Sequence, residues 1–202
     1  MNEPDTLAPD AVRDAYLPPV KILVAGGFGV GKTTAVGAVS EITPLRTEER
    51  LSAAGVGVDD LSGIEQKSAT TVAMDFGRIT LDVAVLMLFG TPGQERFWFM
   101  WDDLLRGALG AVVLVDTRRL DRSFAAVDFF ESRDLPFVVA ANCFHGEQDY
   151  DPEEIRDALT LREPSTPIVM FDARRRDSVR GVLLALMDHL IASAQPAHAQ
   201  RT

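Results

Sequence analysis

The chain has few of the features that would place it in a membrane or outside the cell. Among its 202 residues there is a single cysteine, Cys143, which excludes a disulfide framework and is typical of a reducing compartment. No apolar run approaches the roughly 20 residues that span a bilayer. The sequence also lacks the pattern of a signal peptide and a C-terminal prenylation box, and Asn2 replaces the glycine that N-myristoylation requires. We therefore expect a cytoplasmic protein that reaches a membrane only through partners.

Basic residues are also scarce. Lys and Arg together number 20 against 30 acidic residues, which gives a net charge of −10. Such a balance argues against nucleic acid or an anionic lipid surface as a partner. The content of 47% hydrophobic and 25% charged residues is ordinary for a globular domain. We predict one domain over residues 19–193, between a flexible acidic N-terminal tail (1–18) and a flexible C-terminal tail (194–202).

The chain does contain a glycine-rich segment with a strong chemical meaning. The apolar run Val20–Ala25 leads directly into Gly26-x-x-x-x-Gly31-Lys32-Thr33, the spacing of a phosphate-binding loop between a strand and a helix. Backbone N–H groups of such a loop surround the phosphates, the lysine adds a positive charge, and the hydroxyl ligates Mg²⁺. The predicted phosphate-binding residues of the loop are Gly27, Phe28, Gly29, Val30, Gly31, Lys32, Thr33 and Thr34.

Strand and helix patterns alternate along the chain. Predicted strands cover 20–25, 71–78, 81–89, 109–115, 136–141 and 168–171, and predicted helices cover 32–41, 94–107, 121–133, 152–159 and 177–192. The second and third strands are close enough in sequence to form a hairpin. This order predicts an α/β fold with a six-stranded, mostly parallel sheet, one antiparallel edge strand, and helices on both faces. The long connection 42–70 is predicted to hold a short helix near 47–54.

Two further segments resemble the switch regions of Ras-type small GTPases, which have a P-loop fold. Thr91-Pro-Gly-Gln-Glu-Arg-Phe97 is similar to switch II, where a glycine N–H touches the γ-phosphate and a glutamine orients the attacking water. The resemblance assigns these roles to Gly93 and Gln94. Thr71-Val-Ala-Met-Asp-Phe76 resembles switch I, which assigns Thr71 to Mg²⁺ and the γ-phosphate. The implied catalytic residues are Gln94, Lys32 and Thr71, and the implied metal ligands are Thr33 and Thr71.

The chain departs from this family at two positions near the phosphates. Gly90 stands where most small GTPases carry the aspartate that holds Mg²⁺ through water, so we expect weaker metal binding. Phe28 occupies a loop position where Ras-type proteins often have glycine, close to the γ-phosphate and to the place of Gln94. We therefore expect slow intrinsic hydrolysis.

The base-binding segments depart further. Asn142-Cys-Phe-His145 stands where the family has Asn-Lys-x-Asp, so Cys143 replaces the lysine and His145 the aspartate that clamps guanine. A neutral imidazole accepts only one hydrogen bond, which should weaken discrimination between bases, and Glu147 and Asp149 are close enough in sequence to substitute. Phe171-Asp-Ala-Arg174 resembles the second base-contacting loop. The implied base-binding residues are Asn142, Cys143, His145, Asp172, Ala173 and Arg174.

Taken together, these segments resemble the actinobacterial Ras-like GTPases of conservon operons, which are related to the MglA-type bacterial GTPases. That resemblance implies a switch that binds GTP and GDP with Mg²⁺ and hydrolyses GTP slowly. It also implies a roadblock-domain protein and a sensor-kinase-like protein as partners, with a GTPase-activating protein or exchange factor as further candidates. Members commonly read Asn-Cys-Phe-Asp, so His145 departs even from this group.

Other interpretations stay open at this point. The aromatic segment Phe97–Trp101 is typical of a partner-binding surface, although some of its rings are expected to pack inward. Arg46, Arg50 and Arg96 are candidates for an internal arginine finger or are simply solvated. The alternative functions are a nucleotide-insensitive scaffold with a degenerate base pocket and a P-loop ATPase that uses 112–116 as its Walker B strand.

Overall fold

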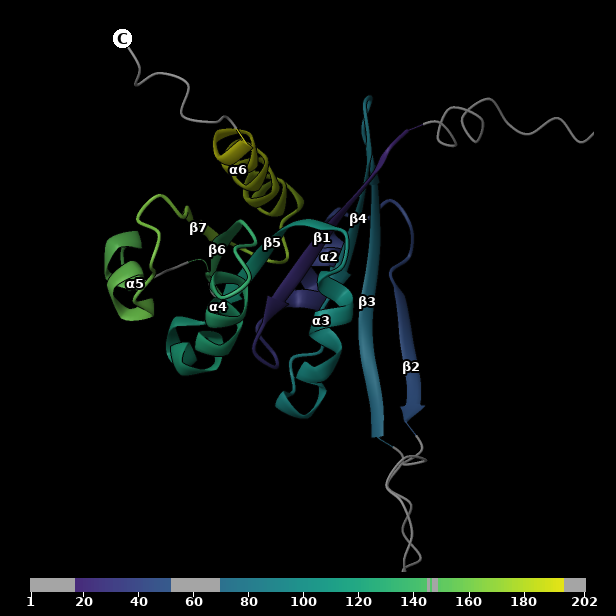
Figure 1. Cartoon of the computed structure of the whole chain (residues 1–202), viewed down its shortest axis with the longest axis horizontal. Coiled ribbons are helices and arrows are strands. Elements are labelled where there is room, and N and C mark those ends of the chain that lie inside the picture. The colour runs from purple at the N-terminus through teal and green to yellow at the C-terminus, as the bar shows by residue number, and fades with distance from the viewer. Residues whose placement is uncertain (1–16, 52–69, 145, 147–148, 195–202) are drawn as a thin grey trace, which may run out of the picture.

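The computed structural model describes residues 17–51, 70–144, 146 and 149–194, which form one mixed sheet flanked by helices (Figure 1). The strands are β1 (Pro19–Gly26), β2 (Leu45–Leu51), β3 (Thr70–Thr80), β4 (Val85–Gly90), β5 (Ala108–Val115), β6 (Phe137–Asn142) and β7 (Ile168–Phe171). The α-helices are α2 (Lys32–Val39), α3 (Trp101–Leu105), α4 (Phe124–Glu131), α5 (Pro152–Leu159) and α6 (Arg176–Ala194). Two 3₁₀ helices, η1 (Glu95–Met100) and η2 (Thr117–Ser123), precede α3 and α4.

The sheet has seven strands in the order β2-β3-β4-β1-β5-β6-β7. The predicted α/β fold, with a mostly parallel sheet and helices on both faces, is confirmed. Strand β3 is the one that runs antiparallel to its neighbours, β2 and β4. The helix predicted near 47–54 is wrong for its first part, because Leu45–Leu51 pairs with β3 along its whole length. This pairing overrides the local helical preference, adds a seventh strand, and places β3 one position inside the edge.

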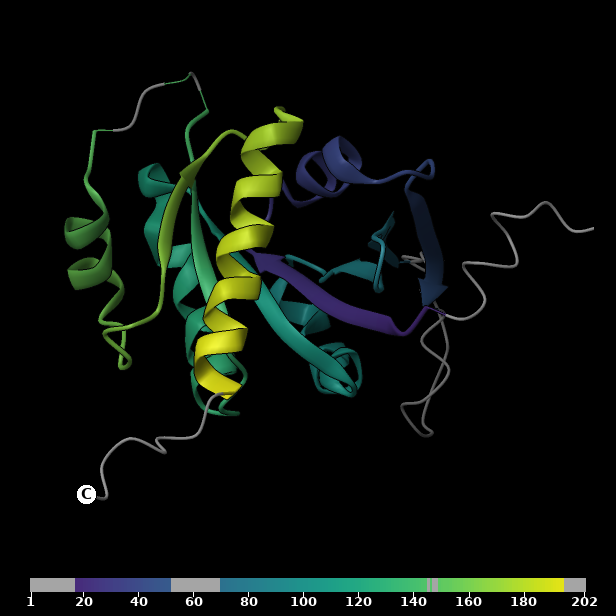
Figure 2. The same cartoon turned by 90° about the horizontal axis from the view of Figure 1, so that it is seen from above.

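Two apolar layers hold the sheet between the helices. Along β1, Ile22 and Val24 pack in the layer that includes α2 and α6, while Leu23 and Ala25 pack in the layer that includes α3, α4 and α5. Strands buried on both faces need continuous apolar sequence, which explains the unbroken run of β1. Figure 2 shows α6 lying across one face of the sheet. Among the described residues, no helix combines the length and the apolar character that crossing a membrane requires.

Helix boundaries follow the predictions where capping signals are clear and differ where loops meet the sheet. The predicted helix 152–159 is confirmed, because Asp151 caps it and Pro152 opens it. The predicted helix 94–107 is instead the short pair η1 and α3. The predicted helix 121–133 begins in η2, whose backbone leaves helical geometry at Arg119 with φ −148° and ψ 51°.

Candidate functional site

The glycine-rich loop lies between the end of β1 and the start of α2. Gly29 and Gly31 have left-handed backbones with φ of 78° and 108°, which side chains disfavour. A Cβ at Gly26 would lie 2.3 Å from the carbonyl oxygen of Leu114, so glycine alone fits there. Helix α2 begins at Lys32 with no side-chain cap and no acidic residue in its first turn. Its first N–H groups therefore point into the loop without a side-chain partner, an arrangement that favours an anion.

Lys32 lies inside this loop and is 9% exposed. Its Nζ donates hydrogen bonds of 2.8 Å each to the carbonyl oxygens of Gly26 and Gly27. Burial lowers the pKa of the Lys32 ammonium to about 8, and the negative charge of Asp75 acts in the opposite direction. A Cβ at Gly93 would lie 2.6 Å from this Nζ. The backbone of Gly93 therefore packs directly on Lys32, which brings the predicted switch II segment against the loop.

A carboxylate that the sequence analysis did not single out faces the magnesium-binding hydroxyl. The Thr33 hydroxyl donates a 2.5 Å hydrogen bond to Oδ2 of Asp75, a buried residue of β3. Asp75 is paired in register with Gly90 of β4. A Cβ at Gly90 would lie 3.0 Å from the Cβ of Asp75 and 3.3 Å from Oδ2. The carboxylate of Asp75 thus occupies the space beside Gly90. Ras-type small GTPases carry an aspartate at the position of Gly90, and here the carboxylate comes from the neighbouring strand, β3.

The pair Thr33 and Asp75 forms a donor set that suits Mg²⁺, because this hard cation prefers a few oxygen ligands and retains water. No group of three or more His, Cys, Asp or Glu side chains that would suit other metals occurs among the described residues. The expectation of weak binding rested on Gly90 alone, and Asp75 removes that reason. Two sequence signals could have found Asp75, namely an acid inside an apolar strand and its hairpin register opposite Gly90.

These groups line a cavity of about 310 Å³ that also contains Phe28, Thr91, Pro92 and Gln94. Thr91 Oγ1 and Gln94 Oε1 are buried, and within the described part of the chain neither has a hydrogen-bond partner. A buried polar atom without a partner is costly, so such atoms mark places where a ligand or water binds. The predicted neighbourhood of Gln94 and the loop is therefore present. Phe28 reaches this cavity but is 67% exposed.

The backbone of Thr71 lies further along the strand that carries Asp75. It lies in β3 and pairs with Arg50 of β2. Asp75 is four positions away along the strand, which corresponds to about 13 Å at about 3.3 Å per residue. Its role at the metal stays a prediction that requires this end of β3 to move. Arg46 and Arg50 lie in β2 and Arg96 lies in η1, and their role as an arginine finger also stays a prediction.

At the other end of the loop, Asn142 connects three segments. Its Nδ2 donates to the carbonyl oxygen of Val30 at 2.9 Å, and its Oδ1 accepts from the N–H of Ala173 at 3.2 Å. A Cβ at Gly31 would lie 2.8 Å from Nδ2, so the loop packs directly on Asn142. Both polar atoms of this side chain are used within the protein. The Ala173 N–H, which the resemblance assigns to the guanine oxygen, is also engaged.

The remaining predicted base-binding residues are split between this end of the sheet and the undescribed loop. Asp172 forms a two-pronged ion pair with Arg174, at 2.9 Å and 2.7 Å, which holds the pKa of the Asp172 carboxyl down at about 2. Cys143 is half-buried, and its N–H donates to Phe171 at 2.7 Å. His145 and Glu147 lie outside the described residues, and Asp149 is exposed. The described polar groups at this end of the sheet thus pair with one another.

The aromatic segment after Gln94 is divided between core and surface. Phe97 and Trp101 are 4% and 2% exposed, whereas Phe99 is 65% exposed. Trp101 packs on Phe129 and Phe130, and its Nε1 donates to the carbonyl oxygen of Pro92 at 3.2 Å. The expectation that some rings pack inward while others stay exposed is confirmed.

Residues 24–193 match the model of a protein family described as conserved hypothetical ATP binding protein. This chain belongs to that family. A curated relative, the uncharacterized protein MJ1339 of Methanocaldococcus jannaschii, is 31% identical over 172 residues, which cover 84% of this chain and 96% of the relative. The match extends from the end of β1 into the last helix, so it covers every residue of the site described above.

Solved structures with the same fold include G domains of FeoB iron transporters. The G domain of T. maritima FeoB is 20% identical, with a TM-score of 0.56, over 88% of this chain and 99% of that chain. The T. maritima cytosolic domain in a GDP form is 17% identical, with a TM-score of 0.60, over 86% of this chain and 64% of that chain. These likenesses confirm the P-loop GTPase type of fold. The conservon-type resemblance is not reproduced by them and stays a prediction.

Proposed function

We propose that this protein binds a purine nucleoside triphosphate with Mg²⁺ in the cavity beside the phosphate-binding loop and hydrolyses it slowly. One observation carries the proposal. Lys32, Thr33 and Asp75 line the same cavity as Thr91 and Gln94, whose buried oxygen atoms have no hydrogen-bond partner among the described residues. Burying so many polar groups together is costly unless a polar ligand completes their hydrogen bonds.

Each residue of the cavity then has a role. The open N–H groups at the start of α2 and the ammonium of Lys32 bind the phosphates. Thr33 and Asp75 would hold Mg²⁺, which neutralises phosphate charge when bound. Gln94 orients the attacking water through its buried Oε1. Phe28, at the rim of the same cavity, narrows the approach to this water and supports a slow rate.

Guanine is the base that we propose, as GTP or GDP. The G-domain fold and the placement of Ala173 beside Asn142 support it. The description of the family as ATP binding supports adenine instead. The deciding experiment is calorimetric titration of nucleotide-stripped protein with GDP, GTP and ATP, with and without Mg²⁺. Tighter binding of ATP than of GTP would replace the guanine assignment with that of a P-loop ATPase.

We further propose that the protein acts as a switch in the cytoplasm. The support is the direct packing of Gly93 on Lys32, because a γ-phosphate at Lys32 must displace the segment that continues into η1 and exposed Phe99. A roadblock-domain protein or a sensor-kinase-like protein is the proposed partner, with a GTPase-activating protein or exchange factor controlling the state. Equal affinity of such a partner for the GDP-bound and GTP-bound protein would contradict this role.

A nucleotide-insensitive scaffold is the second candidate. The observation that favours it is the internal use of polar groups at the base end, where Asn142 and Asp172 are both occupied by protein partners. Absence of binding by every nucleotide in the titration above, with the protein folded, would select this function.

A further inference from the structure

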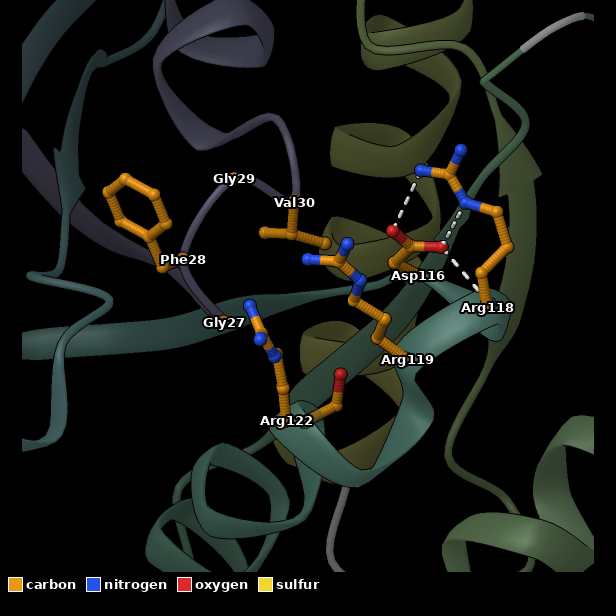
Figure 3. Close-up of a pocket in the computed structure, with 9 residues that line it drawn as sticks. Gly27, Phe28, Gly29, Val30, Asp116, Arg118, Arg119 and Arg122 are labelled. Carbon is orange, nitrogen blue, oxygen red and sulfur yellow. Dashed lines mark hydrogen bonds and ion pairs between the residues drawn. The ribbon is translucent and has the colours of Figure 1, made fainter.

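A second cavity, of about 350 Å³, lies between the phosphate-binding loop and η2 (Figure 3). Phe28 and Gly29 line both this cavity and the one that holds Lys32, so the two spaces meet at these residues. On the side of η2, the lining comes from Arg119, Arg122 and the buried Ser123. Arg119, Arg122 and Ser123 have no role in the proposed function.

The loop and η2 are in direct backbone contact. A Cβ at Gly27 would lie 2.9 Å from the Cβ of Arg122 and 3.3 Å from its carbonyl oxygen, so glycine permits this close approach. The break in η2 at Arg119 turns the backbone out of helical geometry beside the loop. Figure 3 shows the side chains of Arg119 and Arg122 both extending toward the loop, while Phe28 points away from them. The backbone of η2 is therefore held next to the loop, and the two exposed arginine side chains extend toward it.

The charges in this cavity are unbalanced. Arg118 is neutralised by Asp116, to which it donates two hydrogen bonds of 2.8 Å, and its guanidinium lies 3.9 Å from the centre of the Phe144 ring. The side chains of Arg119 and Arg122 make no ion pair and no hydrogen bond with any described residue. Asp116 also attracts Arg119 from a longer distance, but one carboxylate faces three guanidinium groups in this lining, which leaves local positive charge beside the loop.

We propose that Arg119 and Arg122 bind the phosphate groups of the nucleotide held by the loop, from the side opposite Lys32 across Phe28 and Gly29. The inference rests on the proposed function and adds two ligand-binding residues to it. Guanidinium groups suit this task because their planar N–H donors match phosphate oxygens. The two arginines also give the chain a source of positive charge at the phosphates that does not depend on Arg46, Arg50 or Arg96.

The test compares the full chain with the variants R119Q, R122Q and R119Q/R122Q, titrated by calorimetry with GDP and with inorganic pyrophosphate. We expect each single variant to bind both probes about tenfold more weakly and the double variant to lose more, as for the loss of hydrogen bonds to charged groups. Affinity should fall less steeply with added salt in the double variant. The variant R119K/R122K should regain only part of the affinity, because lysine restores the charge but not the planar N–H donors of the guanidinium.

Arg106→Gln is the matched control, because it removes the same charge from an exposed side chain that pairs with Asp103 in α3. A loss as large in Arg106→Gln, or unchanged affinity in R119Q/R122Q, would overturn the inference. Weaker binding of GDP with unchanged binding of pyrophosphate would also overturn the inference, because the arginines would then contact the ribose or the base. Failure of the unchanged protein to bind either probe would overturn the proposed function first. Thermal melting shows whether each variant is folded. If the double variant does not fold, the affinities of R119Q alone decide the test.

Discussion

The two ends of the candidate site differ in how their polar groups are satisfied. At the phosphate end, Thr91 and Gln94 keep buried polar atoms without partners among the described residues. At the base end, Asn142 uses both of its polar atoms on Val30 and Ala173, and Asp172 is occupied by Arg174. A ligand therefore gains most at the phosphate end, where it adds hydrogen bonds without breaking any between protein side chains. This contrast predicts an affinity dominated by phosphates and a weak preference between bases.

The largest effect that would sharpen this contrast is expected from Lys32→Ala. Loss of charge-assisted hydrogen bonds to the phosphates, each worth about 1.5–3 kcal/mol, should weaken GDP binding roughly a hundredfold or more. Calorimetry measures the affinity. Lys21→Ala is the control, since Nζ of Lys21 donates to the backbone of Arg106 and lies over the Phe89 ring, and neither Arg106 nor Phe89 is among the described residues that line the two cavities. Binding retained in Lys32→Ala would place the phosphates elsewhere.

Asn142→Ala tests the base end. It leaves the buried carbonyl of Val30 and the N–H of Ala173 without a partner, so the free energy of unfolding should fall by about 2–4 kcal/mol. Denaturant titration measures this loss, with Cys143→Ala as a control of less than about 1 kcal/mol. Affinities for GTP and ATP should change by the same factor. A loss of affinity for GTP but not for ATP would show that Asn142 contacts the base. It would contradict the contrast drawn between the two ends of the site.

Asp75→Asn should reduce the metal dependence of binding. With one charge fewer beside Thr33, the gain in nucleotide affinity on adding Mg²⁺ should shrink about tenfold, while affinity without Mg²⁺ stays close to that of the unchanged protein. The double variant Asp75→Ala/Gly90→Asp moves the carboxylate from β3 to the paired position on β4. It should restore part of the gain in affinity on adding Mg²⁺. An unchanged magnesium effect in Asp75→Asn would assign the metal to other ligands.

The smallest effect is expected from Arg174→Ala. The Arg174 side chain is 60% exposed and solvent screens its pair with Asp172, so affinity for GDP should change less than about threefold. Equilibrium titration with GDP at moderate salt is sensitive enough to detect a larger change in affinity. A tenfold loss would mean that Arg174 leaves Asp172 to contact the nucleotide.

The phosphate end was largely predictable from the sequence and the base end was not. The loop Gly26–Thr33 is a local motif, because a tight turn between strand and helix needs glycines at fixed spacing. Asp75 depends on the register between β3 and β4, which brings it beside Gly90 across a hairpin. The local sequence of β2 predicts a short helix near 47–54 for the same reason, since only pairing with β3 makes Leu45–Leu51 a strand. The contact between Gly27 and Arg122 depends even less on local sequence, because it joins residues 95 positions apart.

The bond from Trp101 to Pro92 has a practical consequence. The chain has two tryptophans, Trp98 and Trp101, whose rings lie 5.7 Å apart. The indole N–H of Trp101 is held by the carbonyl of the residue just before Gly93. Any displacement of Gly93 from Lys32 pulls on that carbonyl and alters the surroundings of a buried indole. Tryptophan fluorescence therefore reports on the loop without an added label. Stopped-flow measurement of this fluorescence gives the rate at which Gly93 moves away from Lys32.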